Sequence, residues 1–171
     1  MRTKREGIEG DVTPRTPRNK TAAEAERSLM RLCARSERCT GDALRLMERW
    51  GVPPTERKSV VERLVAQRFI DDRRYAEAYT REKSRLAGWG ARKIEYQLRM
   101  KGIEREIIAQ ATAQLDGDIQ RDKLEDKLRR KVRTTKAATQ YELRGKLLRY
   151  AMTQGYDYDM AMEAIECIMA E

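Results

Sequence analysis

Three short turns, each built around a glycine, recur along this sequence at nearly equal intervals. They are Trp50-Gly51-Val52, Lys101-Gly102-Ile103 and Gln154-Gly155-Tyr156, and their glycines lie 51 and then 53 residues apart. Shifting the sequence by these intervals also superimposes apolar residues, for example Met47, Leu98 and Ala151. An internal period of this length is typical of a linear array whose units contact only their neighbours. The sequence therefore predicts tandem repeats.

Proline placement and apolar spacing predict that each repeat is helical. All four prolines precede residue 55, and the 117 residues that follow residue 54 contain none. Within each repeat the apolar residues recur at intervals of three and four, which is the period of an α-helix. About three such segments fit into each unit. The predicted fold class is all-α, with three tandem three-helix repeats and a flexible N-terminal tail.

The same pattern predicts the domain limits. Residues 1–20 are polar and carry six basic and three acidic residues, which is typical of a flexible basic tail. The three repeats are expected at 21–70, 71–119 and 120–171. Asp71-Asp72 stands where the first helix of the second repeat should begin, and a short carboxylate there can accept the free amides of the first turn. Gly117 is expected to close the last helix of the second repeat.

Missing residue types exclude several kinds of chemistry. The chain has no histidine, which excludes Ser–His–Asp and Cys–His catalysis and every histidine-containing metal site. Asp71 and Asp72 have no further acidic partner nearby, so we interpret them as a helix cap rather than a metal site. No nucleophile has a positioned base. We therefore expect no enzymatic activity, no metal and no cofactor.

The cysteine content and hydropathy predict a compartment. There are three cysteines and no secretory signal, a combination typical of reduced, intracellular thiols. No stretch approaches the roughly 18 apolar residues of a membrane span. We expect a cytoplasmic protein, monomeric and without a membrane partner. Cys33 and Cys167 lie on apolar stripes and are expected in the core.

The net charge of +9 is unevenly distributed. Residues 73–105 carry +6 and residues 121–149 carry +7, whereas residues 150–171 carry −5. The first two helices of the second and third repeats are thus basic, and their closing helices are acidic. Such segregation creates a directed field that suits a polyanion on one side of the molecule.

Helical spacing groups some of these cations with a tyrosine. Arg92, Tyr96 and Arg99 share one predicted face, and so do Lys123, Lys127 and Arg130. The repeat shift adds Arg45 and Arg149 as equivalents of Tyr96. The candidate contact residues for nucleic acid are Arg45, Arg92, Tyr96, Arg99, Lys123, Lys127, Arg130 and Arg149, because basic side chains contact phosphate and a tyrosine can stack on a base. An ordinary solvated helix face is the alternative. Trp89, between two glycines, is either a partner anchor or a lid over its own core.

Residues 69–108 resemble the central motif of the RecX family of bacterial recombination regulators. The resemblance is carried by Phe69-Ile70-Asp71-Asp72, Tyr75-Ala76, Tyr79, the Gly90–Arg92–Ile94–Leu98 series and Lys101-Gly102-Ile103, with Gly155-Tyr156 and Tyr158-Asp159 resembling a second glycine-aromatic turn. It implies an elongated, curved array that binds the filament of the RecA recombinase on single-stranded DNA. Whether the chain also binds duplex DNA is left undecided. It also implies inhibition of recombinase, ATPase and co-protease activities.

A second hypothesis needs no recombinase. Three-helix units can act as small helix-turn-helix modules, so the chain could be an autonomous helical protein that binds DNA or RNA. A RecA ATPase assay on single-stranded DNA separates the two hypotheses.

Overall fold

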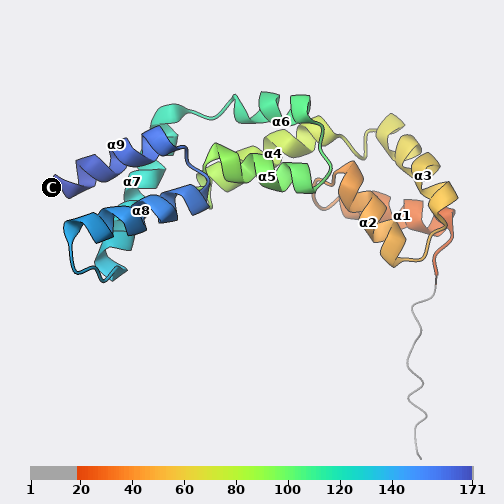
Figure 1. The fold of residues 1–171 in the computed structure, drawn as a ribbon. Helices are drawn as coiled ribbons and strands as arrows, with labels where there is room; N and C mark the ends of the chain where they lie inside the picture. Colours follow the sequence, from red (N-terminus) through yellow and green to blue (C-terminus); the bar gives the residue numbers. More distant parts are fainter. Residues whose placement is uncertain (1–18, 171) are drawn as a thin grey trace, which may run out of the picture.

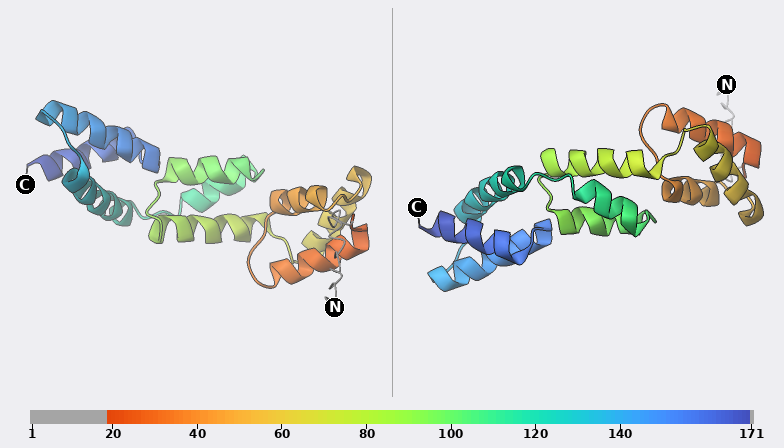
Figure 2. Two further views of the ribbon diagram at one scale, coloured as in Figure 1. Left: turned by 90° about the horizontal axis from the view of Figure 1, so that it is seen from below. Right: turned by 90° about the horizontal axis from the view of Figure 1, so that it is seen from above.

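A computed structural model describes residues 19–170, and every regular element in that range is an α-helix. The helices are α1 (Ala22–Cys33), α2 (Thr40–Arg49), α3 (Pro54–Ala66), α4 (Asp72–Arg85), α5 (Ala91–Met100), α6 (Arg105–Thr112), α7 (Gly117–Thr134), α8 (Gln140–Gln154) and α9 (Tyr158–Met169). They form three groups in an elongated, curved row (Figures 1 and 2). We call these groups repeat 1 (α1–α3), repeat 2 (α4–α6) and repeat 3 (α7–α9). The predicted fold class is confirmed. No described helix is long and apolar enough to span a membrane.

Each repeat has its own apolar core. In the described part of the chain, every closely packed pair of helices lies within one repeat. Positions related by the 51- and 53-residue shifts are buried together: Ala43, Ile94 and Leu147 are fully buried, and so are Met47, Leu98 and Ala151. The apolar stripe of each helix therefore faces the core of its own repeat, and the predicted repeat register is correct.

The recurrent glycines end the second helix of each repeat. Gly51, Gly102 and Gly155 have φ angles of +69°, +83° and +90°, a left-handed conformation in which a side chain would be strained. The domain limits stay a prediction, and the limit at 119/120 falls inside α7. Gly117 begins α7, whereas the sequence pattern suggested that it closes repeat 2. The predicted tail, residues 1–20, lies outside the described residues except for its last two.

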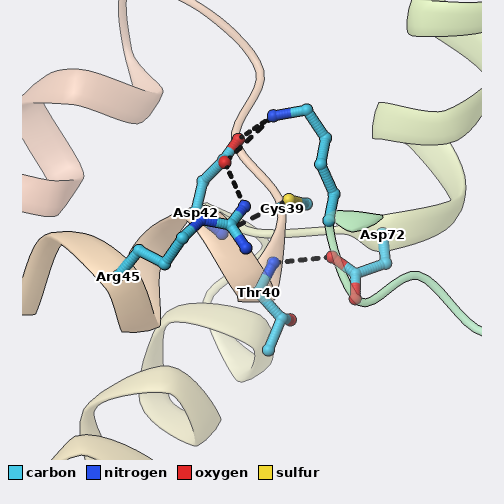
Figure 3. A network of polar contacts seen from close by, with 6 residues as sticks. Cys39, Thr40, Asp42, Arg45 and Asp72 are labelled. Carbon is cyan, nitrogen blue, oxygen red and sulfur yellow. Dashed lines mark hydrogen bonds and ion pairs between the residues drawn. The ribbon is translucent and has the colours of Figure 1, made fainter. Parts of the chain in front are cut away.

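The two aspartates at the start of repeat 2 have separate tasks. Asp71 is the cap of α4, because its side chain accepts a hydrogen bond from the backbone N–H of Arg74 at 3.0 Å. Asp72 instead reaches into repeat 1, where its carboxylate accepts a 2.7 Å hydrogen bond from the backbone N–H of Thr40 at the start of α2 (Figure 3). The predicted cap is thus provided by the first aspartate, and the second joins two repeats.

An ion-pair network completes this contact between repeats 1 and 2. The Lys101 ammonium, at the end of α5, lies 3.0 and 3.1 Å from the two carboxylate oxygens of Asp42. Arg45 contacts the same carboxylate at 2.7 Å (Figure 3). Cys39, the cap of α2, is buried in the core of repeat 2. Burial raises the pKa of its thiol to about 11, so it stays protonated at neutral pH.

Repeats 2 and 3 are joined through hydrogen bonds between helix ends. The backbone N–H groups of Gly90 and Arg92 donate to the carbonyl oxygens of Gln154 and Gly155 at 2.9 and 3.0 Å. The amides at the start of α5 thus meet the carbonyls at the end of α8, groups that lack partners within their own helices and carry opposite partial charges. The three second helices, α2, α5 and α8, follow one another along the molecule (Figure 1).

Candidate nucleic-acid interface

A basic cleft of about 730 Å³ lies between repeats 2 and 3. One wall is the end of α4 and the turn that follows it, residues 85–88. The other wall is one face of α7 together with Tyr150 of α8. The charged side chains that line the cleft are Arg85, Lys123, Asp126, Lys127, Arg130 and Lys131. We call it the junction cleft. It holds five cations and one carboxylate and is of a size that admits a small ligand or part of a chain.

Helix α7 brings three of the predicted contact residues into this cleft. Leu124 and Leu128 are fully buried in the core of repeat 3, which fixes the rotation of the helix about its axis. Lys123, Lys127 and Arg130, spaced four and three residues apart, then line the junction cleft. The three side chains that the sequence placed on one helical face therefore lie together in the structure.

Lys127 connects α7 to the end of α8. Its ammonium donates a 2.7 Å hydrogen bond to Oε1 of Gln154 at the end of α8. Burial lowers the pKa of Lys127, and the nearby charges of Lys93 and Arg130 lower it further. A bound anion would offset this repulsion. Gly88 leaves room for the side chain of Lys127, because a Cβ at position 88 would lie only 2.6 Å from Cε of Lys127.

The cations of the junction cleft have no carboxylate partner among the described residues. Within residues 19–170, none of the five forms an ion pair. Elsewhere in repeat 3, Arg144 and Lys146 are paired with Glu166 and Glu142 at 2.7 and 2.6 Å. Unpaired, clustered cations remain available for phosphate, whereas paired ones are partly neutralised.

The rim of the cleft carries apolar surface suited to a base. Tyr150 lines the cleft, and the Lys131 ammonium lies 5.3 Å from the centre of its ring. Leu86, on the opposite wall, is 84% exposed. An aromatic face beside cations is the usual combination for binding a single strand. Arg85, Tyr150 and Leu86 were not predicted from the sequence, because no helical spacing relates α4, α7 and α8.

The other predicted residues lie along the row of second helices. Arg92 and Tyr96 are exposed on α5, and Tyr96 is 53% exposed. Arg99 lines a separate hollow between α5 and α6, of about 630 Å³. Arg149 is exposed on α8, and Arg45 is exposed on α2 but paired with Asp42, as described above. The structure thus does not gather all eight candidates into one site.

Trp89 packs against the core of repeat 2. Its side chain is half-buried, and the ammonium groups of Lys93 and Lys83 lie 4.6 and 5.7 Å from its ring centre. Of the two roles that the sequence allowed for Trp89, a partner anchor or a lid over its own core, this position corresponds to the lid. No group of three or more potential metal-ligating side chains occurs among the described residues.

Comparison with known proteins finds one family of similar proteins. A family model described as RecX, second three-helix domain, matches residues 71–111. The chain is 29% identical over 170 residues to the regulatory protein RecX of Clostridium beijerinckii, covering 88% of this chain and 79% of that protein. It is 32% identical over 105 residues to the regulatory protein RecX of Clostridium perfringens, covering 60% and 48%. The chain thus spans about half the length of this second relative.

Solved structures share the fold. The crystal structure of RecX from Lactobacillus salivarius superimposes with a TM-score of 0.76 at 17% identity, over 88% of this chain and 97% of that chain. A second crystal structure, of a regulatory protein RecX, gives 0.78 at 21% identity over 88% and 73%. The matched second three-helix domain and the curated relatives show that this chain is similar to regulatory proteins of the RecX family.

Proposed function

We propose that this protein binds the filament that the RecA recombinase forms on single-stranded DNA and inhibits its recombinase, ATPase and co-protease activities. The observation that carries the proposal is the junction cleft, whose five cations have no carboxylate partner in the described chain. Similarity to RecX regulatory proteins supports the identity of the partner.

The cleft suits the phosphate backbone of this filament. Lys123, Arg130 and Arg85 line it from two sides, so consecutive phosphates of one strand meet cations on both walls. Contacts to phosphate carry no sequence preference, as a regulator of a filament on any single strand requires. The other exposed candidates on α2, α5 and α8 lie farther along the same elongated molecule and extend the contact.

The protein acts in this proposal without catalysis or cofactor, as a cytoplasmic monomer in DNA recombination, repair and the SOS response. Its effect comes from occupying the filament, because binding energy that favours one state of the filament changes that state's population. Trp89 remains a proposed partner anchor through its exposed part.

The test is RecA ATPase activity on single-stranded DNA with substoichiometric protein. We expect inhibition that weakens in the double variant Lys123→Gln, Arg130→Gln. The matched control, Lys58→Gln with Arg73→Gln, removes the same charge from exposed helix positions outside the cleft. Full ATPase activity in the presence of the wild-type protein would refute the proposal.

An autonomous nucleic-acid-binding protein is the second candidate. It is favoured by the same cleft, because unpaired cations bind phosphate whether or not a recombinase is present. Tight binding to naked single-stranded DNA or RNA, together with no effect on RecA, would select this alternative.

A further inference from the structure

The walls of the junction cleft belong to two different repeats. Arg85 and the turn to Gly88 come from repeat 2, whereas Lys123, Lys127 and Arg130 come from repeat 3. A ligand that contacts both walls therefore also connects the two repeats.

The joint beneath the cleft is narrow. It includes the backbone hydrogen bonds from Gly90 and Arg92 to the end of α8 and a 3.0 Å hydrogen bond from the Tyr156 hydroxyl to the Gly88 carbonyl. A buried 2.6 Å hydrogen bond from the Gln120 side-chain amide to the Ser84 hydroxyl also joins α7 to α4. No closely packed helix pair crosses from repeat 2 to repeat 3 in the described chain. The angle between the repeats thus depends on a few polar contacts.

Charge acts on this joint. Arg85 lines the repeat 2 wall and the cations of α7 line the other wall, and like charges on the two walls repel. Lys127 already experiences repulsion from repeat 2, because the charge of Lys93 on α5 is among those that lower its pKa. A chain of phosphates placed between the walls replaces the repulsion with attraction to both sides.

We propose that a phosphodiester chain in the junction cleft fixes repeat 3 against repeat 2, so that binding of nucleic acid sets the angle between the two repeats. This inference rests on the proposed function, since it assumes that the cleft binds a single strand. Arg85 is the coupling residue, because it supplies the charged contact on the repeat 2 wall. Lys123 and Arg130 provide affinity from repeat 3 alone.

Amide hydrogen exchange of the full chain, measured by NMR, tests the coupling. Opening of the joint exposes the amides of Gly90 and Arg92, so saturation with a thymidine oligonucleotide should slow their exchange. The expected slowing is about five- to tenfold, at the lower end of typical coupling between sites. The Thr40 amide, which is bonded to Asp72 between repeats 1 and 2, is the internal control and should not change.

The variant Arg85→Gln separates coupling from binding. Linkage is reciprocal, so the variant should lose affinity by the same factor by which the oligonucleotide slows exchange in the wild type. At saturating oligonucleotide it should show no slowing at Gly90 and Arg92. The control Arg81→Gln, one turn earlier on α4 and outside the cleft, should behave as wild type.

Three results would count against these ideas in distinguishable ways. If the wild type binds the oligonucleotide and the two amides exchange at an unchanged rate, the coupling is wrong and the proposed function stands. Slowing that persists in Arg85→Gln also overturns the coupling. If the wild type binds no single-stranded DNA at all, the proposed function fails and the coupling fails with it.

Discussion

Neutralising two cations of the junction cleft should change how salt affects binding. In the double variant Lys123→Gln, Arg130→Gln the buried leucines of α7 are untouched, so the helix and the core of repeat 3 should form as before. Neither cation forms an ion pair in the described chain, and the substitution therefore breaks no internal salt bridge. What it removes is the positive charge that faces the cleft.

The magnitude follows from counterion release. Each phosphate contact on a single strand contributes roughly −0.7 to the slope of log affinity against log salt concentration, so two lost contacts should flatten the slope by ~1.4. Between about 50 and 200 mM salt, the wild type should then lose ~7-fold more affinity than the variant. The difference is large enough to measure without knowing the absolute affinity.

Fluorescence anisotropy of a labelled thymidine oligonucleotide at four or more salt concentrations provides the slopes, and circular dichroism checks the fold. The matched variant Lys58→Gln, Arg73→Gln should retain the wild-type slope. A wild-type slope in the cleft variant, or an equal flattening in the control, would show that the junction cleft holds no phosphate.

Three further predictions concern stability. Asp71→Ala should lower the free energy of urea unfolding by about 0.5–2 kcal/mol through loss of the α4 cap, and an unchanged unfolding midpoint would contradict that role. Burial opposes ionisation of Asp42, but hydrogen bonds from its cationic neighbours outweigh it and lower its pKa. The ionised Asp42 carboxylate should therefore contribute fully to the free energy of unfolding above pH ~4, the pKa of an aspartate in the unfolded chain, and this contribution should be lost as the pH falls through the lower pKa of the folded state. Asp42→Asn should reduce this acid dependence when unfolding is measured from pH ~5 to ~2. Tyr156→Phe should cost about 0.5–1.5 kcal/mol by leaving the Gly88 carbonyl without its hydroxyl donor, and equal thermal midpoints would argue against that bond.

The sequence predicted what lies within a repeat far better than what lies between repeats. Met47, Leu98 and Ala151 could be recognised as core residues because helical periodicity and the glycine spacing both act over short distances along the chain. Arg85 and Tyr150 could not be assigned to one cleft, because their proximity depends on how α4, α7 and α8 meet. The pattern records which face of a helix is apolar and does not record the angle between neighbouring units.

The role of a residue was also harder to predict than the element on which it lies. The Asp71-Asp72 pair was correctly placed at the start of a helix, yet one carboxylate caps that helix and the other bonds to Thr40 in repeat 1. Cys167, expected in the core, is exposed, whereas Cys39 is buried in the neighbouring repeat. For Asp72 and Cys39 the deciding factor is a contact between units, which a single helical stripe does not encode.

The joining of repeats through helix ends has a consequence for how such chains can evolve. The middle unit presents a helix start to repeat 3 and its glycine turn to repeat 1. Its contacts with the end of α8 are backbone hydrogen bonds that a duplicated unit would also supply, whereas its contacts with repeat 1 are made mainly by side chains. Duplication of a unit can therefore reproduce this joint, whereas deletion of repeat 1 would remove Cys39 from the core of repeat 2. Selection on a chain of this kind can add units, and with them the length of partner that the chain covers, more easily than it can remove them.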